Sequence, residues 1–315
     1  MRLFLGVDGG QSSTTALIGG ESGCVLGAGS GGPCNHVGAA EGRAKFTQAI
    51  TECVGAACAQ AGLDAGRIRF EAACLGMSGG PADKQAILAQ VLAVDRLVVT
   101  DDARIALTGA TAGEPGVITI AGTGSIAFGR NAAGRCARVG GWGYVFGDEG
   151  GGFDLTRQAL RAALRYEEGW GPATALHRLL LDQTGAADVN DLLHRFYTEE
   201  FPRPRIATFA KLVDQAGNDG DPAAIEILHN AAQQLAALAA SVQRQLWGPD
   251  EPARVAYIGG VFRGRRLLER FRTLVELGGS RCGPPIHGPA AGALLEAYRA
   301  AGLYPMLTNV PEFKL

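Results

Sequence analysis

The sequence lacks the lysine and cysteine patterns by which several common classes of enzyme and metal-binding protein are recognised. Only four lysines occur in 315 residues, and none of them follows a glycine, so the chain has no G-x-x-x-x-G-K-[ST] phosphate loop. No Cys-x-x-Cys pair is present, and an odd number of scattered cysteines argues against a disulfide framework, a zinc site or an iron–sulfur cluster. We expect small, reduced side chains at the seven cysteines, which are Cys24, Cys34, Cys53, Cys58, Cys74, Cys136 and Cys282.

Long apolar runs and a charge imbalance are also absent. The first apolar run covers only residues 3–7 before it meets Asp8, which is too short for a signal peptide or a membrane span. The 29 basic and 31 acidic residues leave a net charge of −2, so no net positive field attracts nucleic acid or an anionic membrane. We therefore expect a cytoplasmic protein that binds neither nucleic acid nor membrane.

Glycine, by contrast, is abundant. The 47 glycines are roughly double the usual share and follow no collagen-like period. Many backbone positions are therefore expected to need a positive φ or a close approach of another segment. A length of 315 residues is typical of about two domains.

The pattern of apolar runs and turns repeats once along the chain. In the first half it predicts three strands, a helix and two further strand and helix pairs, at residues 3–7, 14–18, 24–26, 39–61, 70–75, after 81, 97–100 and from 103. The second half predicts three strands, a helical stretch, a strand, a helix, a weak strand and a last helix, at 117–121, 126–129, 136–139, 153–247, 255–258, 265–277, 285–286 and 290–301. The halves meet near residues 110–116, where Gly, Pro and Thr cluster. The second half thus repeats the order of the first with a helical insertion.

Two familiar motifs compete with this interpretation. The G-x-G-x-x-G pattern at 27–32 lacks the strand, loop and helix context of a dinucleotide site, and Pro33 follows it directly. Residues 76–80 (GMSGG) have the G-x-S-x-G spacing of a serine hydrolase around Ser78, and Asp148 and His287 would complete a Ser, Asp, His order. No oxyanion loop lies upstream, so the hydrolase is kept only as an alternative.

Two glycine-rich turns occupy equivalent places, at the first hairpin of each half: residues 8–14 (DGGQSST) and 121–125 (AGTGS). Small residues let backbone N–H groups approach phosphate oxygens, and Ser and Thr hydroxyls add donors, as in an anion-binding nest. Asp8 would repel a phosphate unless a cation such as Mg²⁺ lies between them. The alternative is a pair of ordinary hairpin turns in which Asp8 accepts local N–H bonds.

Four segments carry a family resemblance: residues 5–14 (LGVDGGQSST), 120–125 (IAGTGS), 140–150 (GGWGYVFGDEG) and 258–261 (IGGV). Together they resemble the BadF/BadG/BcrA/BcrD-type ATPase family, and within it the N-acetylglucosamine and glucosamine kinases, over residues 3–300. This family is part of the sugar kinase, Hsp70 and actin superfamily. The resemblance implies an α/β fold of two ribonuclease-H-like (actin-like ATPase) domains, with mixed β-sheets flanked by helices and the active-site cleft between them. The implied domains are 1–112 and 113–288, the latter with the helical insertion, followed by a C-terminal helix in 289–315 that returns to the first domain.

The resemblance also implies a site for ATP and Mg²⁺. The second turn would be one phosphate loop, with Thr123 on the γ-phosphate side, and Asp8 in the other would hold Mg²⁺ through water. Gly259 and Gly260 would flank the adenosine. The implied phosphate-loop residues are Asp8, Gly9, Gly10, Ser12, Ser13 and Thr14 in the first turn and Gly122, Thr123 and Gly124 in the second.

The catalytic base of such kinases follows a strand of the first domain, where this chain has two neighbouring aspartates. Asp102 matches the base of the family, and Asp101 stands where asparagine is common, so the choice between the two stays open. A base must lie within hydrogen-bond reach of the attacking hydroxyl. Without the resemblance, the pair would be interpreted as a helix N-cap and a first-turn acid.

For the sugar, the resemblance implies side chains rich in hydrogen-bond donors and acceptors. These residues are Asn35, His36, Ser78, Asp102, Gly141, Trp142 and Asp148. Each has a simpler interpretation as well. Asn35 suits a turn, Trp142 a core position and Asp148 a helix cap before Phe153.

The resemblance thus predicts transfer of the γ-phosphoryl group of ATP to the 6-hydroxyl of an amino sugar, with N-acetylglucosamine as the first choice and glucosamine as the second. The expected partners are the sugar and ATP, and a homodimer is expected by analogy with such kinases. The alternatives are the serine hydrolase and a non-catalytic sugar or nucleotide sensor of the same fold.

Overall fold

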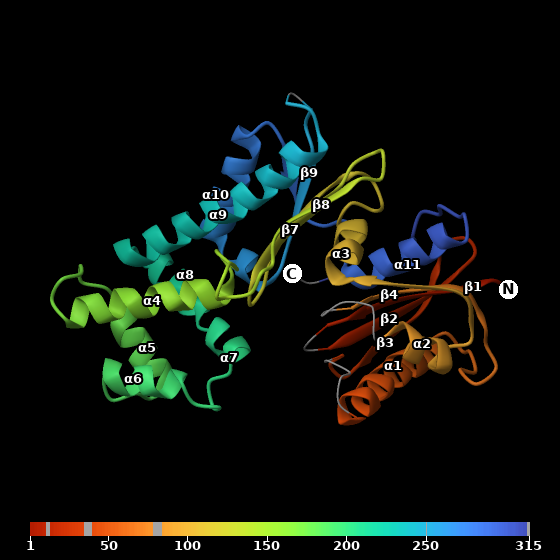
Figure 1. The fold of residues 1–315 in the computed structure, drawn as a ribbon, viewed down its shortest axis with the longest axis horizontal. Coiled ribbons are helices and arrows are strands. Elements are labelled where there is room, and N and C mark those ends of the chain that lie inside the picture. The colour runs from red at the N-terminus through yellow and green to blue at the C-terminus, as the bar shows by residue number, and fades with distance from the viewer. Residues whose placement is uncertain (11–12, 35–39, 78–83, 250, 314–315) are drawn as a thin grey trace. The chain divides into compact units, whose positions relative to one another are not determined.

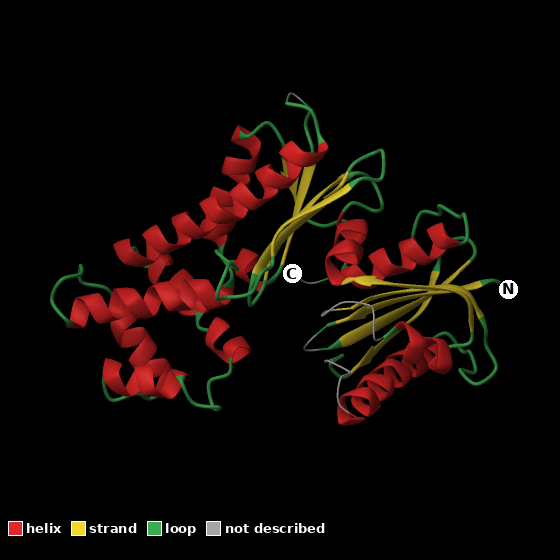
Figure 2. Cartoon of the chain, in the orientation of Figure 1, coloured by secondary structure: helices red, strands yellow, loops and turns green. Residues whose placement is uncertain are grey.

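The computed structural model describes residues 1–10, 13–34, 40–77, 84–249 and 251–313. The chain divides into two compact units, unit 1 with Met1–Glu114 and Pro285–Lys314, and unit 2 with Pro115–Pro284 (Figure 1). The domain boundaries predicted at 112/113 and 288/289 lie two and four residues from these divisions. Figure 2 shows the strands of each unit gathered in a sheet with helices beside it.

The sheet of unit 1 has the strand order β3-β2-β1-β4-β5. β2 runs antiparallel to both β1 and β3, whereas β4 runs parallel to both β1 and β5. The strands are β1 (Leu3–Gly9), β2 (Thr14–Gly20), β3 (Val25–Gly31), β4 (Phe70–Met77) and β5 (Val94–Asp101). The helices are α1 (Ala40–Gln60), α2 (Gln85–Val91), α3 (Asp102–Ala110) and α11 (Pro289–Ala300).

Both faces of this sheet are covered, and the alternation along β1 shows how. Leu5 and Val7 belong to a buried cluster shared with α1, whereas Phe4 belongs to a second cluster shared with α11. The rings of Phe4 and Tyr298, on α11, lie 4.3 Å apart, and Figure 1 shows α1 and α11 on opposite sides of the sheet. Successive strand residues point to opposite faces, so Asp8 lies on the α11 side.

Strand β3 is longer than predicted, and this explains the G-x-G-x-x-G pattern. The prediction of a strand at 24–26 was wrong in length, because the strand continues to Gly31. A Cβ atom at Gly27, Gly29 or Gly31 would collide with backbone oxygen atoms of α1. These glycines therefore let a helix and a strand pack backbone to backbone, which is a structural and not a nucleotide-binding role.

Helices α3 and α11 cross in close contact. A Cβ atom at Gly292 would collide with the backbone of α3, so glycine is required at the crossing. Beside it, the buried carboxylate of Glu296 accepts a hydrogen bond from the Thr108 hydroxyl at 2.6 Å and pairs with Arg299 at 3.0 Å. Hydrogen bonds to a charged group are stronger than neutral ones, so the last helix holds α3, which begins at Asp102, in place.

Unit 2 repeats the sheet of unit 1. Its strand order is β10-β9-β6-β7-β8, with an antiparallel β6-β7-β8 meander and parallel β6-β9 and β9-β10 pairs. The strands are β6 (Gly116–Ala121), β7 (Ser125–Arg130), β8 (Cys136–Gly140), β9 (Arg254–Ile258) and β10 (Arg281–Gly283). The predicted repeat and the α/β class with two mixed, helix-flanked sheets are confirmed.

The last short strand was predicted in the wrong place. Instead of residues 285–286, β10 covers Arg281–Gly283. Prolines follow at 284 and 285, and a proline has no N–H to donate to a sheet. The N–H groups of Ile286 and His287 instead bond to backbone oxygens of Ala110 and Gly109, at 3.1 and 3.0 Å.

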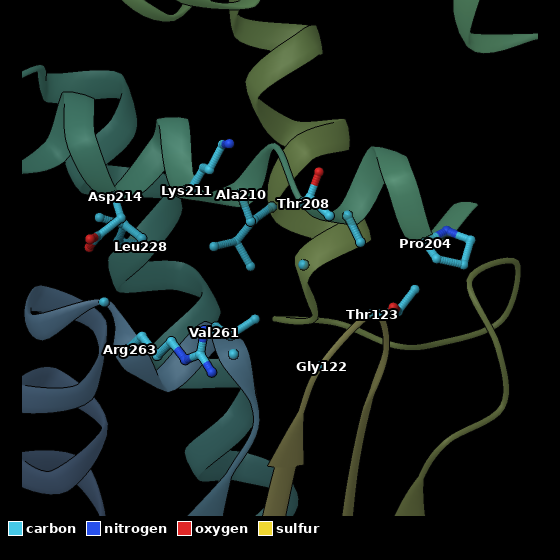
Figure 3. A pocket seen from close by; sticks show the side chains of 15 residues that line it. Gly122, Thr123, Pro204, Thr208, Ala210, Lys211, Asp214, Leu228, Val261 and Arg263 are labelled. Carbon is cyan, nitrogen blue, oxygen red and sulfur yellow. The ribbon is translucent and has the colours of Figure 1, made fainter. Parts of the chain in front are cut away.

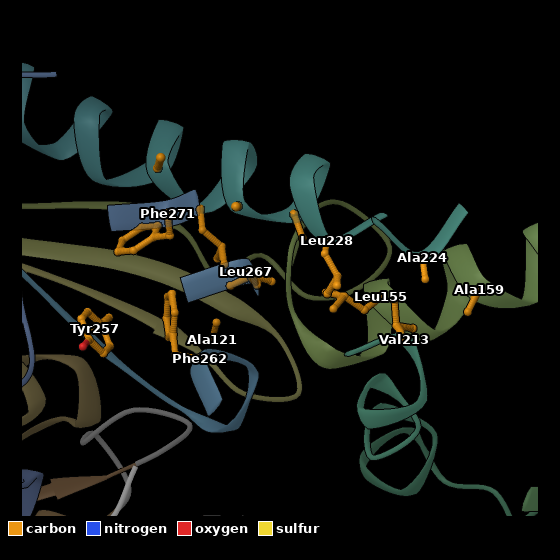
Figure 4. Packing of buried hydrophobic residues seen from close by; sticks show 14 of the residues in the cluster. Ala121, Leu155, Ala159, Val213, Ala224, Leu228, Tyr257, Phe262, Leu267 and Phe271 are labelled. Carbon is orange, nitrogen blue, oxygen red and sulfur yellow. The ribbon is translucent and has the colours of Figure 1, made fainter. Parts of the chain in front are cut away.

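The helical insertion and one large apolar core make up the rest of unit 2. The helices are α4 (Gly152–Glu167), α5 (Leu176–Thr184), α6 (Val189–Phe196), α7 (Arg203–Ala207), α8 (Ala210–Asn218), α9 (Pro222–Leu246), the 3-10 helix η1 (Gly260–Arg263) and α10 (Arg265–Leu277). Figure 4 shows Phe262 and Phe271 packed together, with ring centroids 5.0 Å apart. Aromatic pairs of this kind add about 0.5–1.5 kcal/mol beyond burial. No helix within the described ranges combines the length and the apolarity needed to cross a bilayer.

The contact between β3 and α1 predicts opposite effects for two glycine substitutions. Gly29→Ala places a methyl group against the backbone of α1 and should destabilise the protein by about 1–3 kcal/mol. Gly55→Ala, within α1, meets no atom within 4 Å and should stabilise the helix by about 0.5–1 kcal/mol. Urea denaturation measures both, and equal effects of the two changes would contradict the packing described.

Candidate active site

In unit 1, the predicted first phosphate loop is a tight turn between β1 and β2. The N–H of Gly10 donates to the Ser13 oxygen at 3.0 Å, and the N–H of Cys34 donates to the Gly10 oxygen at 2.9 Å. A Cβ atom at Gly9 would collide with the Met77 sulfur. Ser13 is exposed, and Ser12 lies outside the described residues. The turn is thus closed by backbone bonds and packed tightly on one side.

Thr14 has a different environment from the other residues of this turn. Its side chain is fully buried, and its hydroxyl donates to the Gly32 oxygen at 2.7 Å and contacts the Cys34 sulfur at 2.9 Å. A buried hydroxyl that is already bonded is not available to a phosphate. Thr14 therefore supports the turn, contrary to its predicted place among the phosphate-binding residues.

Asp8 is a partly buried acid near the carboxyl end of β1. Burial and, to a smaller extent, the nearby negative charge of Asp102 together raise its pKa from 3.8 to about 7. Both causes penalise the ionised form. A bound cation would reverse that penalty, and Mg²⁺ is commonly held by one or two carboxylates together with phosphate oxygens and water. The environment of Asp8 therefore fits a Mg²⁺ ion that arrives with a phosphate, and within the described ranges no group of three or more potential ligands gathers to hold a metal by itself.

The two candidate bases differ in what they contact. Asp101 is the N-cap of α3, and its Oδ1 accepts a hydrogen bond from the Arg104 N–H at 2.8 Å. Asp102 begins the helix, is half-buried and acts electrostatically on Asp8. The simpler interpretation therefore describes both positions: Asp101 is the cap and Asp102 is the first-turn acid of α3. Asp102 differs in that its charge also acts on Asp8, at the end of β1.

In unit 2, the Gly122–Gly124 turn lies against the N-terminus of α4. The N–H groups of Gly152 and Phe153 donate to the oxygens of Gly122 and Thr123, at 2.8 and 3.1 Å. A Cβ atom at Gly151, the N-cap of α4, would come within 2.7–2.9 Å of the turn's backbone. The positive end of the α4 dipole therefore lies at this turn, which favours an anion there.

A cavity of about 410 Å³ opens beside this turn (Figure 3). Gly122 and Thr123 form one side of it, and Gly260 lines another. Gly259, which is expected beside the adenosine, has a φ of +113° and packs on the backbone of Ala121, and its place beside the adenosine stays a prediction. The remaining lining residues are Gly152, Leu155, Pro204, Ala207, Thr208, Ala210, Lys211, Asp214, Leu228, Val261, Arg263 and Gly264.

Most of these lining residues were missed from the sequence. They come from α4, α7, α8, α9 and η1 and from the residues beside them, segments far apart in the sequence. Most are small or apolar, which is equally typical of a core, and the charged ones, Lys211, Asp214 and Arg263, stand in no recognisable motif. One buried oxygen within this set, Oδ1 of Asp214, has no hydrogen-bond partner.

The structure describes some of the predicted sugar residues and not others. Asn35, His36 and Ser78 lie outside the described residues. Trp142 is 72 % exposed, so its simpler interpretation as a core residue is wrong. Its neighbour Gly141 has φ +70°, in the region that favours glycine.

The position beside Trp142 is held by an arginine. The Arg138 guanidinium donates to the Gly141 oxygen at 2.6 Å and lies over the Trp142 ring at 5.4 Å. An exposed aromatic ring fixed in this way can pack against the apolar face of a ligand.

Asp148 is buried, and it is not a helix cap. Its φ of +66° is strained for a residue other than glycine, and the N-cap of α4 is Gly151. Its Oδ2 pairs with Arg203 at 2.7 Å, and its Oδ1 accepts a long hydrogen bond from the Ser125 N–H at 3.4 Å. In the described part of the chain the carboxylate of Asp148 meets Arg203 and Ser125 and no histidine, which leaves the Ser, Asp, His alternative without geometric support.

A sheet that occurs twice, each time with a glycine hairpin at its first turn, is typical of an ATPase of the actin-like kind, and comparison with known proteins agrees. The sequence profile of the BadF/BadG/BcrA/BcrD ATPase family matches residues 5–297, and the chain belongs to this family. The predicted resemblance is therefore confirmed.

Three relatives narrow the comparison. The chain is 31 % identical to the N-acetylmuramic acid/N-acetylglucosamine kinase of Clostridium acetobutylicum, over 88 % of this chain and 91 % of that one. It is 29 % identical to the N-acetyl-D-glucosamine kinase of Dictyostelium discoideum, over 84 % and 87 % of the two chains. A crystal structure from Chromobacterium violaceum, provisionally named an N-acetylglucosamine kinase, is 30 % identical with a TM-score of 0.77, covering 94 % of this chain and 98 % of that one.

The raised pKa of Asp8 predicts a pH-dependent effect of Asp8→Asn on stability without ligand. Because the folded-state pKa of about 7 exceeds the ordinary 3.8, the wild type loses stability as pH rises from about 4 to 7, and the variant does not. Between pH 5 and pH 8, the free energy of unfolding of the variant should therefore rise by roughly 2 kcal/mol relative to that of the wild type. Urea denaturation at both pH values measures this, with Asp182→Asn at an exposed position as the control. A difference that is the same at both pH values would contradict the burial of an ionised Asp8.

Proposed function

We propose that the protein is an ATP-dependent sugar kinase that transfers the γ-phosphoryl group to the 6-hydroxyl of an amino sugar. N-acetylglucosamine is the preferred acceptor and glucosamine the second. The proposal is carried by the Gly122–Gly124 turn, which lies under the α4 N-terminus at the rim of the 410 Å³ cavity. Two relatives bear the names of kinases for N-acetylglucosamine, which supports the choice of substrate.

ATP would bind in the cavity of unit 2. Thr123 and the N–H groups of its turn would steady the γ-phosphate, helped by the α4 dipole. Gly260 and the apolar side chains of Leu228 and Val261 would surround the adenosine. A flat aromatic base gains from apolar walls of this kind, and the phosphates gain from backbone donors.

Two aspartates of unit 1 would carry the chemistry. Asp102 would orient the attacking hydroxyl and accept its proton. Asp8 would hold Mg²⁺ through water, and the ion would neutralise charge on the phosphates. Asp101 keeps its role as the cap of α3.

The sugar would be held by polar and aromatic groups. The predicted residues are Asn35, His36, Ser78, Gly141, Trp142 and Asp148. Hydroxyl-rich ligands need donors and acceptors in fixed directions, together with an apolar surface for the ring.

We further propose the cytoplasm as the location, because all seven cysteines are free thiols, which suits a reducing compartment. A homodimer stays a prediction, which light scattering of the purified protein would measure.

A panel of acceptors tests the proposed reaction. ADP formation should depend on sugar and be fastest with N-acetylglucosamine, compared with glucosamine, N-acetylmuramic acid and glucose. A 6-deoxy analogue should give no turnover. ADP formation without sugar dependence would remove the kinase, and ester hydrolysis lost in Ser78→Ala would support the hydrolase instead.

Substitution of the two aspartates tests the base. Asp102→Asn should lower kcat by about a thousandfold while leaving the sugar Kd nearly unchanged, since a general base contributes to the transition state. Asp101→Asn is the matched control, because asparagine caps a helix as well as aspartate does and kcat should stay within tenfold. Retained turnover in Asp102→Asn with an unchanged pH profile would exclude Asp102 as the base.

A further inference from the structure

One carboxylate lies where a phosphate-binding loop should not tolerate it. A Cβ atom at Gly124 would collide with the carboxylate of Asp148, so this acid lies directly against the turn. The side chain of Asp148 is only 7 % exposed. A buried negative charge beside a phosphate loop repels the phosphates that the loop is meant to bind, because interactions are poorly screened there.

The guanidinium of Arg203 pairs with this charge. Nη2 of Arg203 lies 2.7 Å from Oδ2 of Asp148. The guanidinium also lies over the Tyr144 ring at 5.1 Å and near the Phe153 ring at 6.0 Å, which fixes its orientation from two further sides. The two rings contact each other, with centroids 5.2 Å apart, so the planar cation rests on an aromatic pair and is better defined than a surface lysine would be.

The position of Arg203 in the fold ties it to the same cavity. It begins α7, and the residues that follow it on that helix, Pro204 and Ala207, line the cavity with Thr123. Figure 3 shows Pro204 on the Thr123 side and Asp214 on the opposite side. Arg203 itself does not line the cavity, and the two cations that do, Lys211 and Arg263, lie with Asp214 away from Thr123 in this view.

We propose that Arg203 is a positioning residue that neutralises and fixes Asp148 against the Gly122–Ser125 turn, so that this turn can accept the phosphates of ATP. The proposal rests on the proposed function of that turn. Asp148 is also a predicted sugar residue. The pair with Arg203 would therefore affect both the phosphate loop and the sugar site. Arg203 acts through Asp148 and contacts neither the sugar nor the reacting atoms.

The charge on the nucleotide provides the test. Calorimetric titration measures two affinities: that for AMP-PNP in the presence of Mg²⁺, a ligand with three phosphate groups, and that for adenosine, which carries none. Arg203→Met should weaken AMP-PNP binding tenfold or more and leave adenosine binding within twofold. Arg203→Lys should retain part of the AMP-PNP affinity, because it keeps the charge.

A double variant separates charge from structure. Arg203→Met with Asp148→Asn should restore AMP-PNP binding to within about threefold of the wild type, because the unpaired carboxylate is gone. Arg205→Met is the matched control on the same helix, where the arginine pairs with Glu200 and stacks on Phe201, and it should bind both ligands as the wild type does.

The contrary outcomes are distinct. Equal weakening of AMP-PNP and adenosine by Arg203→Met, with no recovery in the double variant, would assign Arg203 to the structure of α7 and overturn the inference. AMP-PNP binding unchanged in Arg203→Met would overturn it as well. A wild-type protein that binds neither ligand would instead overturn the proposed function, and the inference with it.

Discussion

Backbone groups can serve as anion donors only where no side chain keeps the ligand or the neighbouring helix away, and this constraint shapes unit 2. The Gly122–Gly124 turn meets the first residues of α4 at backbone distance, which Gly151 and Gly152 permit. The same contact brings the helix dipole to the turn and leaves Gly122 open to the cavity. Larger residues at these positions would separate the two elements, and the donors would no longer point to one place.

Asp148, which is buried, and Asp8, which is partly buried, differ in what balances their charge. Asp148 has a counter-ion within the protein, because Arg203 lies 2.7 Å from its carboxylate. Asp8 is costly to ionise, because burial and, to a smaller extent, the like charge of Asp102 raise its pKa to about 7. In the proposed function a divalent cation would remove that cost, so Asp8 would contribute binding energy only when Mg²⁺ arrives with the nucleotide.

The sequence predicts much of the fold and part of the site, and the physical reasons for the difference can be named. Turns with glycine and alternating strands are local patterns, so both meanders and the pairing of their hairpins were predicted correctly. Strand β3 was not, because Gly27, Gly29 and Gly31 are explained only by contact with α1, which is distant in sequence. The family motif placed Thr123 in the second phosphate loop, and the folded chain has Thr123 lining the cavity, but no motif marks the α8 residues that line it too.

Asp148 is a residue whose role the local sequence suggested wrongly. Its place before Phe153 suggested a cap, and only the folded chain reveals its left-handed backbone and its pairing with an arginine 55 residues away. Strained backbone is tolerated where its surroundings enforce it, which is common at functional sites.

The contact between α3 and α11 has a consequence for the order in which the chain folds during its synthesis. On a ribosome, β1 through α3 emerge first, yet the partner of Gly109 and Thr108 is synthesised only after the whole of unit 2. The continuous segment Pro115–Pro284 can gather its own core while the ends wait, and the residues around Asp8 and Asp102 acquire their supporting helix last. Nascent chains would therefore carry the cavity of unit 2 before Asp8 and Asp102, the acids of the proposed reaction, have their supporting helix.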